Sequence, residues 1–237
     1  MPDPSIPVRA AVVDFDGTIC EHDVSEEILR AFAPPDWEDI DVEFQRGAIG
    51  SRACMVRQAA LLHGSQQDML SLAMSNYAID PTFARFVEWA RQADVEVAVA
   101  SDGLGFYIEP MLRAGGVVGV TVLTNEAAIV PGERPSLSFP NAHPVCVGCG
   151  TCKMQAVQAL RDRLGPVAFV GEGHSDRYGA IYADVVFAKK HLVDICRADG
   201  VAFHEWDTFD DVRAGLESLR EVPGRLWPAR CPGWETA

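Results

Sequence analysis

Two acidic residues follow the first apolar segment of the chain and are the first candidates for chemistry. Residues 10–13 are typical of a buried strand, and Asp14 and Asp16 come directly after them. Carboxylates near a buried strand are costly in free energy unless a cation or another partner compensates their charge. The pair therefore indicates a site that holds a metal ion, a substrate or both.

Chemically active residue types also follow two later strand-like segments, residues 95–101 and 166–171. In a doubly wound sheet, ligands bind beyond the carboxyl ends of the strands. We therefore expect these residues to meet the first acidic pair at one edge of the sheet, close to a lysine that begins a helix after a tight Gly-Thr turn. The residues concerned are Ser101, Asp102, Gly103, Lys153, Glu172 and Asp176.

An oxygen-rich cluster of this kind suits phosphate chemistry assisted by Mg²⁺, which prefers oxygen ligands and often bridges to a substrate phosphate. An ionised carboxylate can attack phosphorus, and a second carboxylate two residues on can donate a proton to the leaving oxygen. Ser101 and Lys153 can hold phosphate oxygens while charge shifts in the transition state. Gly17 and Gly103 leave room for backbone amides to approach the anion.

The elements that must position these residues alternate between strands and helices. This alternation predicts an α/β fold with a doubly wound, mainly parallel sheet. Between the first two strands the pattern is helical throughout, with capping residues and glycine stops that separate several helices. We therefore expect a core formed by residues 1–20 and 93–237, with an inserted all-helical cap formed by residues 21–92 and joined by two short linkers.

The four segments resemble, in order, the motifs of the haloacid dehalogenase superfamily. They are D-F-D-G-T at residues 14–18, the serine at 101, the lysine at 153 and G-E-G-x-S-D at residues 171–176. The helical insertion resembles the type-one cap of the phosphoserine phosphatase-like branch. The resemblance implies an Mg²⁺-dependent phosphatase that acts on a small phosphorylated metabolite through an aspartyl-phosphate.

The resemblance also implies a role for each site residue. Asp14 would be the nucleophile and Asp16 the acid/base, while Asp23 would contact the substrate. The phosphate group would be bound by Ser101, Asp102, Gly103 and Lys153. The metal ligands would be Asp14, Asp16 through its main-chain carbonyl, Glu172 and, in support of the metal shell, Asp176.

Two residues depart from the pattern of the superfamily. Aspartate is usual where Glu172 stands, and glycine is usual where Asp102 stands. The longer Glu172 side chain changes the reach to the metal. The carboxylate of Asp102 would repel a phosphate group unless it turns away or meets a cation.

Two other functions use the same residues. A phosphotransferase or mutase would pass the phosphoryl group to a second alcohol, and release of phosphate without an acceptor would distinguish it from a phosphatase. A non-catalytic family member would bind a phosphorylated ligand without turnover, but Asp14, Asp16 and Lys153 argue against this alternative.

The cysteine residues suggest a second hypothesis. Cys146, Cys149 and Cys152 recur at three-residue spacing after His143, a pattern that can bind structural Zn²⁺. The alternative is a compact loop whose thiols pack and position Lys153. The other four cysteines are scattered, which favours free thiols over a disulfide framework.

The remaining observations concern partners and the cap. The net charge of −14 argues against nucleic acid, and no apolar run approaches the length that a membrane helix needs. We expect a cytoplasmic monomer or homodimer whose phosphate site depends on local cations. We interpret Trp37, Phe44 and Met55 as cap core, and His174 as a site-edge or surface residue. We expect the arginines on the cap helices, Arg46, Arg52 and Arg57, to be mostly solvated.

Overall fold

The computed structural model describes residues 7–222, 224–231 and 233, and its centre is a sheet of seven strands in the order β4-β3-β2-β1-β5-β6-β7. All neighbouring pairs are parallel except β3 and β4. The sequence prediction of a doubly wound, mainly parallel sheet is therefore confirmed. The strands are β1 (Ala10–Val13), β2 (Glu96–Leu104), β3 (Thr121–Ala128), β4 (Ser136–Ser138), β5 (Val167–Gly171), β6 (Val185–Ala188) and β7 (His204–Glu205).

The first strand lies in the middle of the sheet because its residues are apolar on both faces. Val12 of β1 is in register with Ala98 of β2 on one side and Phe169 of β5 on the other. A central parallel strand is covered on both faces, so it is rich in apolar residues without alternation. This arrangement brings the residues after β1, β2 and β5 to the same edge of the sheet.

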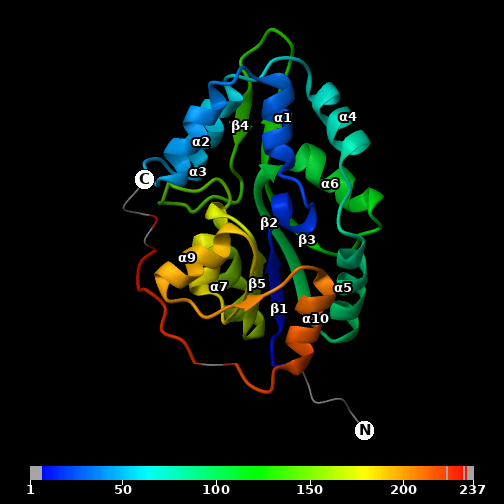
Figure 1. Ribbon diagram of the computed structural model, residues 1–237, viewed down its shortest axis with the longest axis vertical. Coiled ribbons are helices and arrows are strands. Elements are labelled where there is room, and N and C mark those ends of the chain that lie inside the picture. Colours follow the sequence, from blue (N-terminus) through cyan, green and yellow to red (C-terminus); the bar gives the residue numbers. More distant parts are fainter. Residues whose placement is uncertain (1–6, 223, 232, 234–237) are drawn as a thin grey trace.

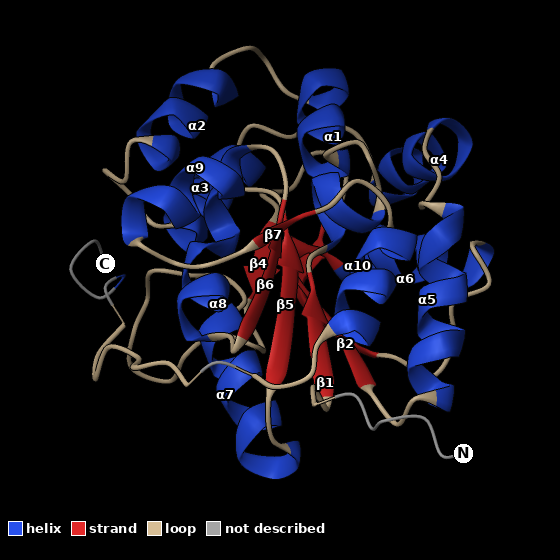
Figure 2. Cartoon of the chain, turned by 60° about the horizontal axis from the view of Figure 1, so that its bottom comes forward, coloured by secondary structure: helices blue, strands red, loops and turns tan. Residues whose placement is uncertain are grey.

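Helices cover the two faces of the sheet, as Figure 2 shows. On one face are α5 (Pro81–Gln92), α6 (Gly105–Ala114) and α10 (Phe209–Ser218). On the other are α7 (Lys153–Leu164), α8 (Arg177–Tyr182) and α9 (His191–Asp199). The tail contributes to the second face, because Arg161 of α7 stacks on the ring of Trp227 at 3.9 Å.

Four further helices lie beyond the carboxyl ends of the strands, at the top of Figure 1. They are α1 (Val24–Phe32), α2 (Trp37–Gln45), α3 (Ser51–Ala59) and α4 (Gln66–Asn76). Asp23 caps α1 by accepting a hydrogen bond from the Glu26 amide, and Ser65 forms a capping box with Asp68 at the start of α4. These helices form the roof of the site described below.

The fifth helix, α5, packs with the sheet layer. Its residues Phe83 and Phe86 contact Phe209 of α10, with ring centroids 4.7 and 5.5 Å apart. These rings belong to the same apolar cluster as Val97 and Val99 of β2. The division of the chain into residues 1–20 and 93–237 as core and 21–92 as cap stays a prediction, and in that division α5 would be the cap segment that packs against the core.

The helical roof also contacts the core away from the two chain connections. The loop of residues 139–152 packs on α3, where the Arg52 amide donates to the Gly148 carbonyl at 3.2 Å and the Arg52 guanidinium lies over the Phe139 ring. Gly50 lies so close to Gly148 that a Cβ atom at position 50 would overlap the Gly148 carbonyl. The roof is therefore attached to the core at a third place.

No helix in the described part of the chain is long and apolar enough to cross a membrane.

Candidate active site

The loop after β1 folds back on itself so that both acidic residues stay under the roof. Residues Phe15–Ile19 form a single irregular turn in which Gly17 has a φ of 69°, in the left-handed region that favours glycine. The side chains of Asp14 and Asp16 are buried, with residue exposures of 4% and 9%. The sequence prediction of two carboxylates at the edge of the sheet thus corresponds to a buried pair.

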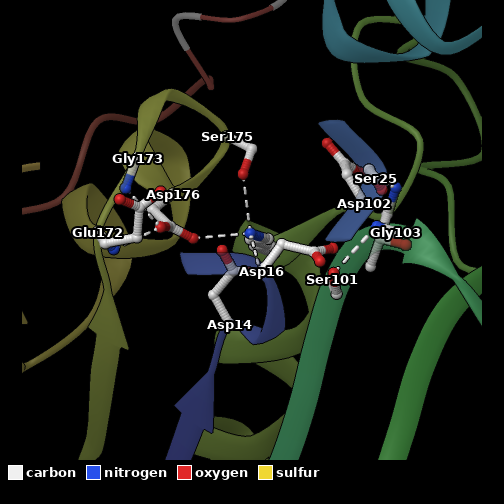
Figure 3. Close-up of polar contacts among 12 residues, drawn as sticks. Asp14, Asp16, Ser25, Ser101, Asp102, Gly103, Glu172, Gly173, Ser175 and Asp176 are labelled. Carbon is white, nitrogen blue, oxygen red and sulfur yellow. Dashed lines mark hydrogen bonds and ion pairs between the residues drawn. The ribbon is translucent and has the colours of Figure 1, made fainter. Parts of the chain in front are cut away.

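Lys153 provides the cation beside Asp14. Its ammonium group lies 2.8 Å from Asp14 Oδ1 and 2.6 Å from Asp176 Oδ1, and it donates to the Ser175 hydroxyl at 2.9 Å. Figure 3 shows Asp14, Ser175 and Asp176 pointing toward this common point. Burial alone would lower the pKa of Lys153, but the carboxylates of Asp14 and Asp176 outweigh burial and hold that pKa above its usual value.

The carboxyl group of Asp16 is held from two sides. Its Oδ1 atom accepts from the Val24 amide at 3.0 Å, and its Oδ2 atom accepts from the Tyr107 hydroxyl at 2.7 Å. Burial raises the pKa of Asp16 to about 6, against the opposing effect of these hydrogen bonds. An acid with a pKa near neutrality can both donate and accept a proton at the pH of a cell.

The second motif turns its backbone toward the cavity. The buried Ser101 hydroxyl accepts from the Gly103 amide at 2.9 Å, which leaves its own proton free for a ligand oxygen. The Asp102 carboxylate accepts from the Thr151 amide at 2.6 Å, so this acid is partnered with the turn before α7. A phosphate contact from Asp102 would therefore come from its backbone amide.

The third strand end supplies Glu172 and Asp176. Asp176 is fully buried; its Oδ2 atom accepts from the amides of Glu172 and Gly173, and its Oδ1 atom accepts from Lys153. Because both oxygens have protein donors, Asp176 fits the supporting role better than direct ligation of a metal. Glu172 reaches back over Gly17, where an added Cβ atom would lie 2.6 Å from its carboxyl carbon.

The cavity above these groups has a volume of about 510 Å³. Asp14, Asp16, Ser101, Asp102, Gly103 and Glu172 line it from the sheet side. Asp23, which is exposed, lines it from the start of α1. The structure thus places these seven predicted residues around one space, with Lys153 and Asp176 behind Asp14.

The roof of the cavity differs from the sequence interpretation at several residues. Trp37 is buried at 5% exposure and Met55 packs against the apolar core, as expected for cap core, and Trp37, Phe44 and Met55 also line the cavity, which the sequence interpretation did not include. His174 also lines it, with its ring 6.3 Å from that of Phe44. The three cap arginines are not among its lining residues, and Arg57 instead pairs with Glu43 at 2.6 Å.

The zinc hypothesis receives no support. Within the described residues, no group of three or more His, Cys, Asp or Glu side chains is placed to hold a metal ion, and all seven cysteines are free thiols. The His143 ring nitrogen Nδ1 accepts from the backbone amides of Val145 and Cys146. Burial raises the pKa of Cys152 to about 11, so in the absence of a metal ion this residue is a thiol.

Three residues of the site were missed by sequence reasoning. Tyr107 holds Asp16, and Asn125 joins the second motif to the α7 loop by donating to the Asp102 carbonyl at 2.8 Å and accepting from the Thr151 hydroxyl. Lys190 places its ammonium group 3.4 Å from Glu172 Oε2. Tyr107 and Asn125 follow no recognisable motif, whereas Lys190 is the second of two consecutive lysines after β6.

The buried pair of Asp14 and Asp16 beside Lys153 is the kind of site found in hydrolases that use an aspartate pair. Comparison with known proteins identifies the family. A profile of haloacid dehalogenase-like hydrolases matches residues 11–180. The chain belongs to this family, which confirms the resemblance seen in the sequence.

Two curated relatives are 2-hydroxy-3-keto-5-methylthiopentenyl-1-phosphate phosphatases. The protein from Brevibacillus brevis is 31% identical over 88% of this chain and 95% of its own length. The protein from Bacillus pumilus is 28% identical over 88% of this chain and 91% of its own length.

Solved structures with the same fold include two phosphoserine phosphatases. A phospho-aspartyl intermediate analogue of one has a TM-score of 0.68 at 14% identity, covering 88% of this chain and 98% of that chain. The enzyme from T. onnurineus has a TM-score of 0.66 at 18% identity, covering 92% and 98%. At these identities the likeness concerns the fold alone.

Proposed function

We infer that this family member is a phosphatase that hydrolyses a small phosphomonoester with Asp14 as nucleophile. The observation that carries the proposal is the buried Asp14–Lys153 ion pair at 2.8 Å, beneath a cavity that Asp16 lines from the same loop. A nucleophilic carboxylate, a cation for the phosphate and a second acid are the groups that phosphate ester hydrolysis requires.

The residues present fit an Mg²⁺ ion. Burial and Asp176 raise the pKa of Asp14 well above its usual value in spite of Lys153, and burial raises the pKa of Glu172. The acids at this edge therefore exceed the nearby cations, and their donor atoms are all oxygen. Asp14, Glu172 and the Asp16 carbonyl would hold the ion, which typically needs only one or two carboxylates besides water and phosphate. When bound, Mg²⁺ would neutralise negative charge on the phosphate group.

Each residue of the site then has its own role in the proposed reaction. Asp14 attacks phosphorus, the bond to the ester oxygen breaks, and Asp16 gives its proton to the departing alcohol. Asp16 next takes a proton from the water that attacks the aspartyl-phosphate, which restores Asp14 and releases phosphate. Lys153, Ser101 and the Asp102 amide hold the phosphate oxygens throughout, while the Gly103 amide is bound to the Ser101 hydroxyl.

The lining of the cavity favours a leaving group without a second negative charge. From the roof, acidic and apolar side chains line the cavity, whereas the arginines of residues 21–76 do not. The acids are Glu21, Asp23, Glu26, Glu27 and Asp41. A carboxylate on the substrate would meet like charges in this part of the cavity, and Lys190, which also lines the cavity, is already paired with Glu172.

We therefore propose a substrate with an uncharged, partly apolar alcohol portion. The name of the two relatives describes a phosphate ester with hydroxyl, keto and methylthio groups, which is of this kind. Phosphoserine carries a carboxylate and is the contrasting compound. Seven free thiols fit a reducing compartment, which supports a cytoplasmic location.

The test is phosphate release from a panel of esters without an added acceptor alcohol. The panel contains the methylthiopentenyl ester, phosphoserine and para-nitrophenyl phosphate, each with Mg²⁺ and with a chelator. We expect Mg²⁺-dependent release and a higher kcat/KM for the uncharged ester than for phosphoserine. Full activity in a metal-stripped sample, or no release from any ester, would contradict the proposed function. Preference for phosphoserine would contradict only the substrate class.

A further inference from the structure

Tyr107 is a buried side chain whose hydroxyl contacts the candidate acid/base and the roof at once. It is fully buried on α6, donates to Asp16 Oδ2 at 2.7 Å and lies 2.7 Å from the Ser25 hydroxyl of α1. An ionised carboxylate can only accept, so the tyrosine proton goes to Asp16 and the serine proton goes to the tyrosine oxygen. The result is a chain of two hydrogen bonds from α1 through α6 to Asp16.

The local packing is arranged around this chain. A Cβ atom at Gly103 would lie 2.5 Å from Asp16 Oδ2 and would also overlap the Tyr107 hydroxyl. The absence of a side chain at 103 therefore leaves the space in which the bond forms. On the other side of the carboxyl group, Val24 at the start of α1 donates its amide to Asp16 Oδ1.

These contacts restrict the carboxyl group to one orientation. With Oδ1 bound to the Val24 amide and Oδ2 bound to Tyr107, the carboxyl group is fixed, and its remaining lone pairs are left to carry the proton that is exchanged with the substrate. Because α1 supplies Val24 directly and Ser25 through Tyr107, the position of the roof determines the position of this proton.

We propose that Tyr107 is a positioning residue that orients Asp16 for proton transfer to the leaving group and couples this orientation to α1. The inference rests on the proposed function, in which Asp16 is the acid/base. Tyr107 does not itself touch the reacting atoms. Tyr107 instead holds the Asp16 carboxyl group, whose oxygen contacts the reacting atoms, in a fixed orientation by a hydrogen bond.

The dependence of the rate on the leaving group separates this role from a structural one. The phenolate leaving phenyl phosphate needs protonation, whereas the nitro group of para-nitrophenyl phosphate stabilises the departing anion without it. General acid catalysis contributes roughly 10²–10⁴-fold, so a misoriented acid should lose a part of that factor only with the poor leaving group. The two esters are of similar size, which keeps their binding comparable.

The experiment measures kcat/KM for both esters with Mg²⁺ in wild type, Tyr107→Phe and Ser25→Ala. We expect Tyr107→Phe to lower the value for phenyl phosphate by roughly 10–100-fold and that for para-nitrophenyl phosphate by less than about threefold. Ser25→Ala should move the ratio in the same direction by about twofold or more. Asp16→Asn should lower kcat/KM for phenyl phosphate more than for para-nitrophenyl phosphate, and by a larger factor than Tyr107→Phe does.

Tyr182→Phe is the matched control. Tyr182 is equally enclosed, with 2% exposure, and its hydroxyl donates to the Pro228 carbonyl outside the cavity. The control should leave the ratio of the two kcat/KM values unchanged. If Tyr107→Phe does not fold, the Ser25→Ala ratio decides the question.

Three outcomes would overturn the proposal. An equal fall in kcat/KM for both esters would make Tyr107 a structural residue. Unchanged kcat/KM values in both Tyr107→Phe and Ser25→Ala would remove Tyr107 from proton transfer. A wild-type protein that releases phosphate from neither of these two esters nor from the methylthiopentenyl ester and phosphoserine would remove the proposed function as well, and that result is recognised before any variant is compared.

Discussion

Lys153 and Asp14 form an ion pair 2.8 Å long in which the side chains are 1% and 6% exposed. Few places in a protein can hold such a pair, because removing both charges from water is costly unless further partners are present. Here Asp176 and Ser175 complete the environment of the ammonium group. The nucleophile of the proposed reaction is thus already held beside the cation that would receive the phosphate group.

Replacing Asp14 by asparagine should abolish turnover while the fold survives. A neutral amide cannot attack phosphorus, and Lys153 keeps Asp176 as a charged partner. Phosphate release should fall by at least about a thousandfold, with an unchanged circular dichroism spectrum. A variant that keeps several per cent of the activity would show that another residue is the nucleophile.

Asp176 should be important for stability as well as for activity. Asp176→Ala removes the acceptor of two backbone amides and one partner of a buried lysine, a loss of about 3–5 kcal/mol in the free energy of unfolding. Asp176→Asn keeps an acceptor oxygen and should lose clearly less. Urea denaturation of the two variants gives the comparison, and equal losses would mean that the hydrogen bonds from Glu172 and Gly173 contribute little.

Glu172 should affect the Mg²⁺ requirement according to whether a carboxylate remains. Glu172→Asp should raise the Mg²⁺ concentration for half-maximal activity less than Glu172→Ala does, because only the alanine variant loses the candidate oxygen ligand. Titration of activity with Mg²⁺ measures both values. If they are the same, Glu172 is not a ligand of the metal.

Asp23 tests whether the start of α1 contacts the substrate. Because Asp23 is the N-cap of α1, Asp23→Ala changes both the cap and the charge, whereas Asp23→Asn keeps a good capping residue. If Asp23 accepts a hydrogen bond from the alcohol portion, Asp23→Asn should weaken transition-state stabilisation by about 1–3 kcal/mol for the best ester of the panel.

Para-nitrophenyl phosphate is the control for that measurement, since it offers no hydrogen-bond donor. The ratio of the two kcat/KM values should therefore fall in Asp23→Asn. A ratio that falls only in Asp23→Ala would assign Asp23 to the helix cap, and the substrate would be recognised elsewhere in the cavity.

Lys190 should be a source of backbone strain. It has a φ of 48° and a ψ of −128°, a conformation that costs a residue with a side chain about 1–3 kcal/mol. Lys190→Gly should therefore be more stable than Lys190→Ala, since both lose the ammonium group and only glycine relieves the strain. Thermal denaturation of this matched pair checks the order; an alanine variant as stable as the glycine variant would refute the strain.

The sequence allowed the sheet and the positions of its functional ends to be predicted, because both depend on local patterns. The apolar run before Asp14 and the glycines after each strand mark these ends without reference to distant residues. The side-chain partners of the site could not be predicted in the same way. Tyr107 is 91 residues from Asp16, and nothing near it in the sequence distinguishes a tyrosine that binds a carboxylate from one that packs in the core.

The roof shows the same limit. Trp37, Phe44 and Met55 have helical spacing that suits burial, and burial against a cavity leaves the same pattern as burial against other helices. The helix that follows, α5, continues the helical run in the sequence, yet its phenylalanines pack against α10 from the far end of the chain. Periodicity identifies an apolar face but not the element that covers it.

The close approach of Gly50 to Gly148 has a consequence for the history of the chain. A side chain at position 50 would push the loop of residues 139–152 away from α3, and the same loop leads into Lys153. A lineage that lengthens or reshapes the start of α3 must therefore alter the distant loop in compensation, or lose the placement of its lysine. We expect substitutions in these two segments to occur together among relatives, as a correlated pair of positions that lie far apart in the sequence.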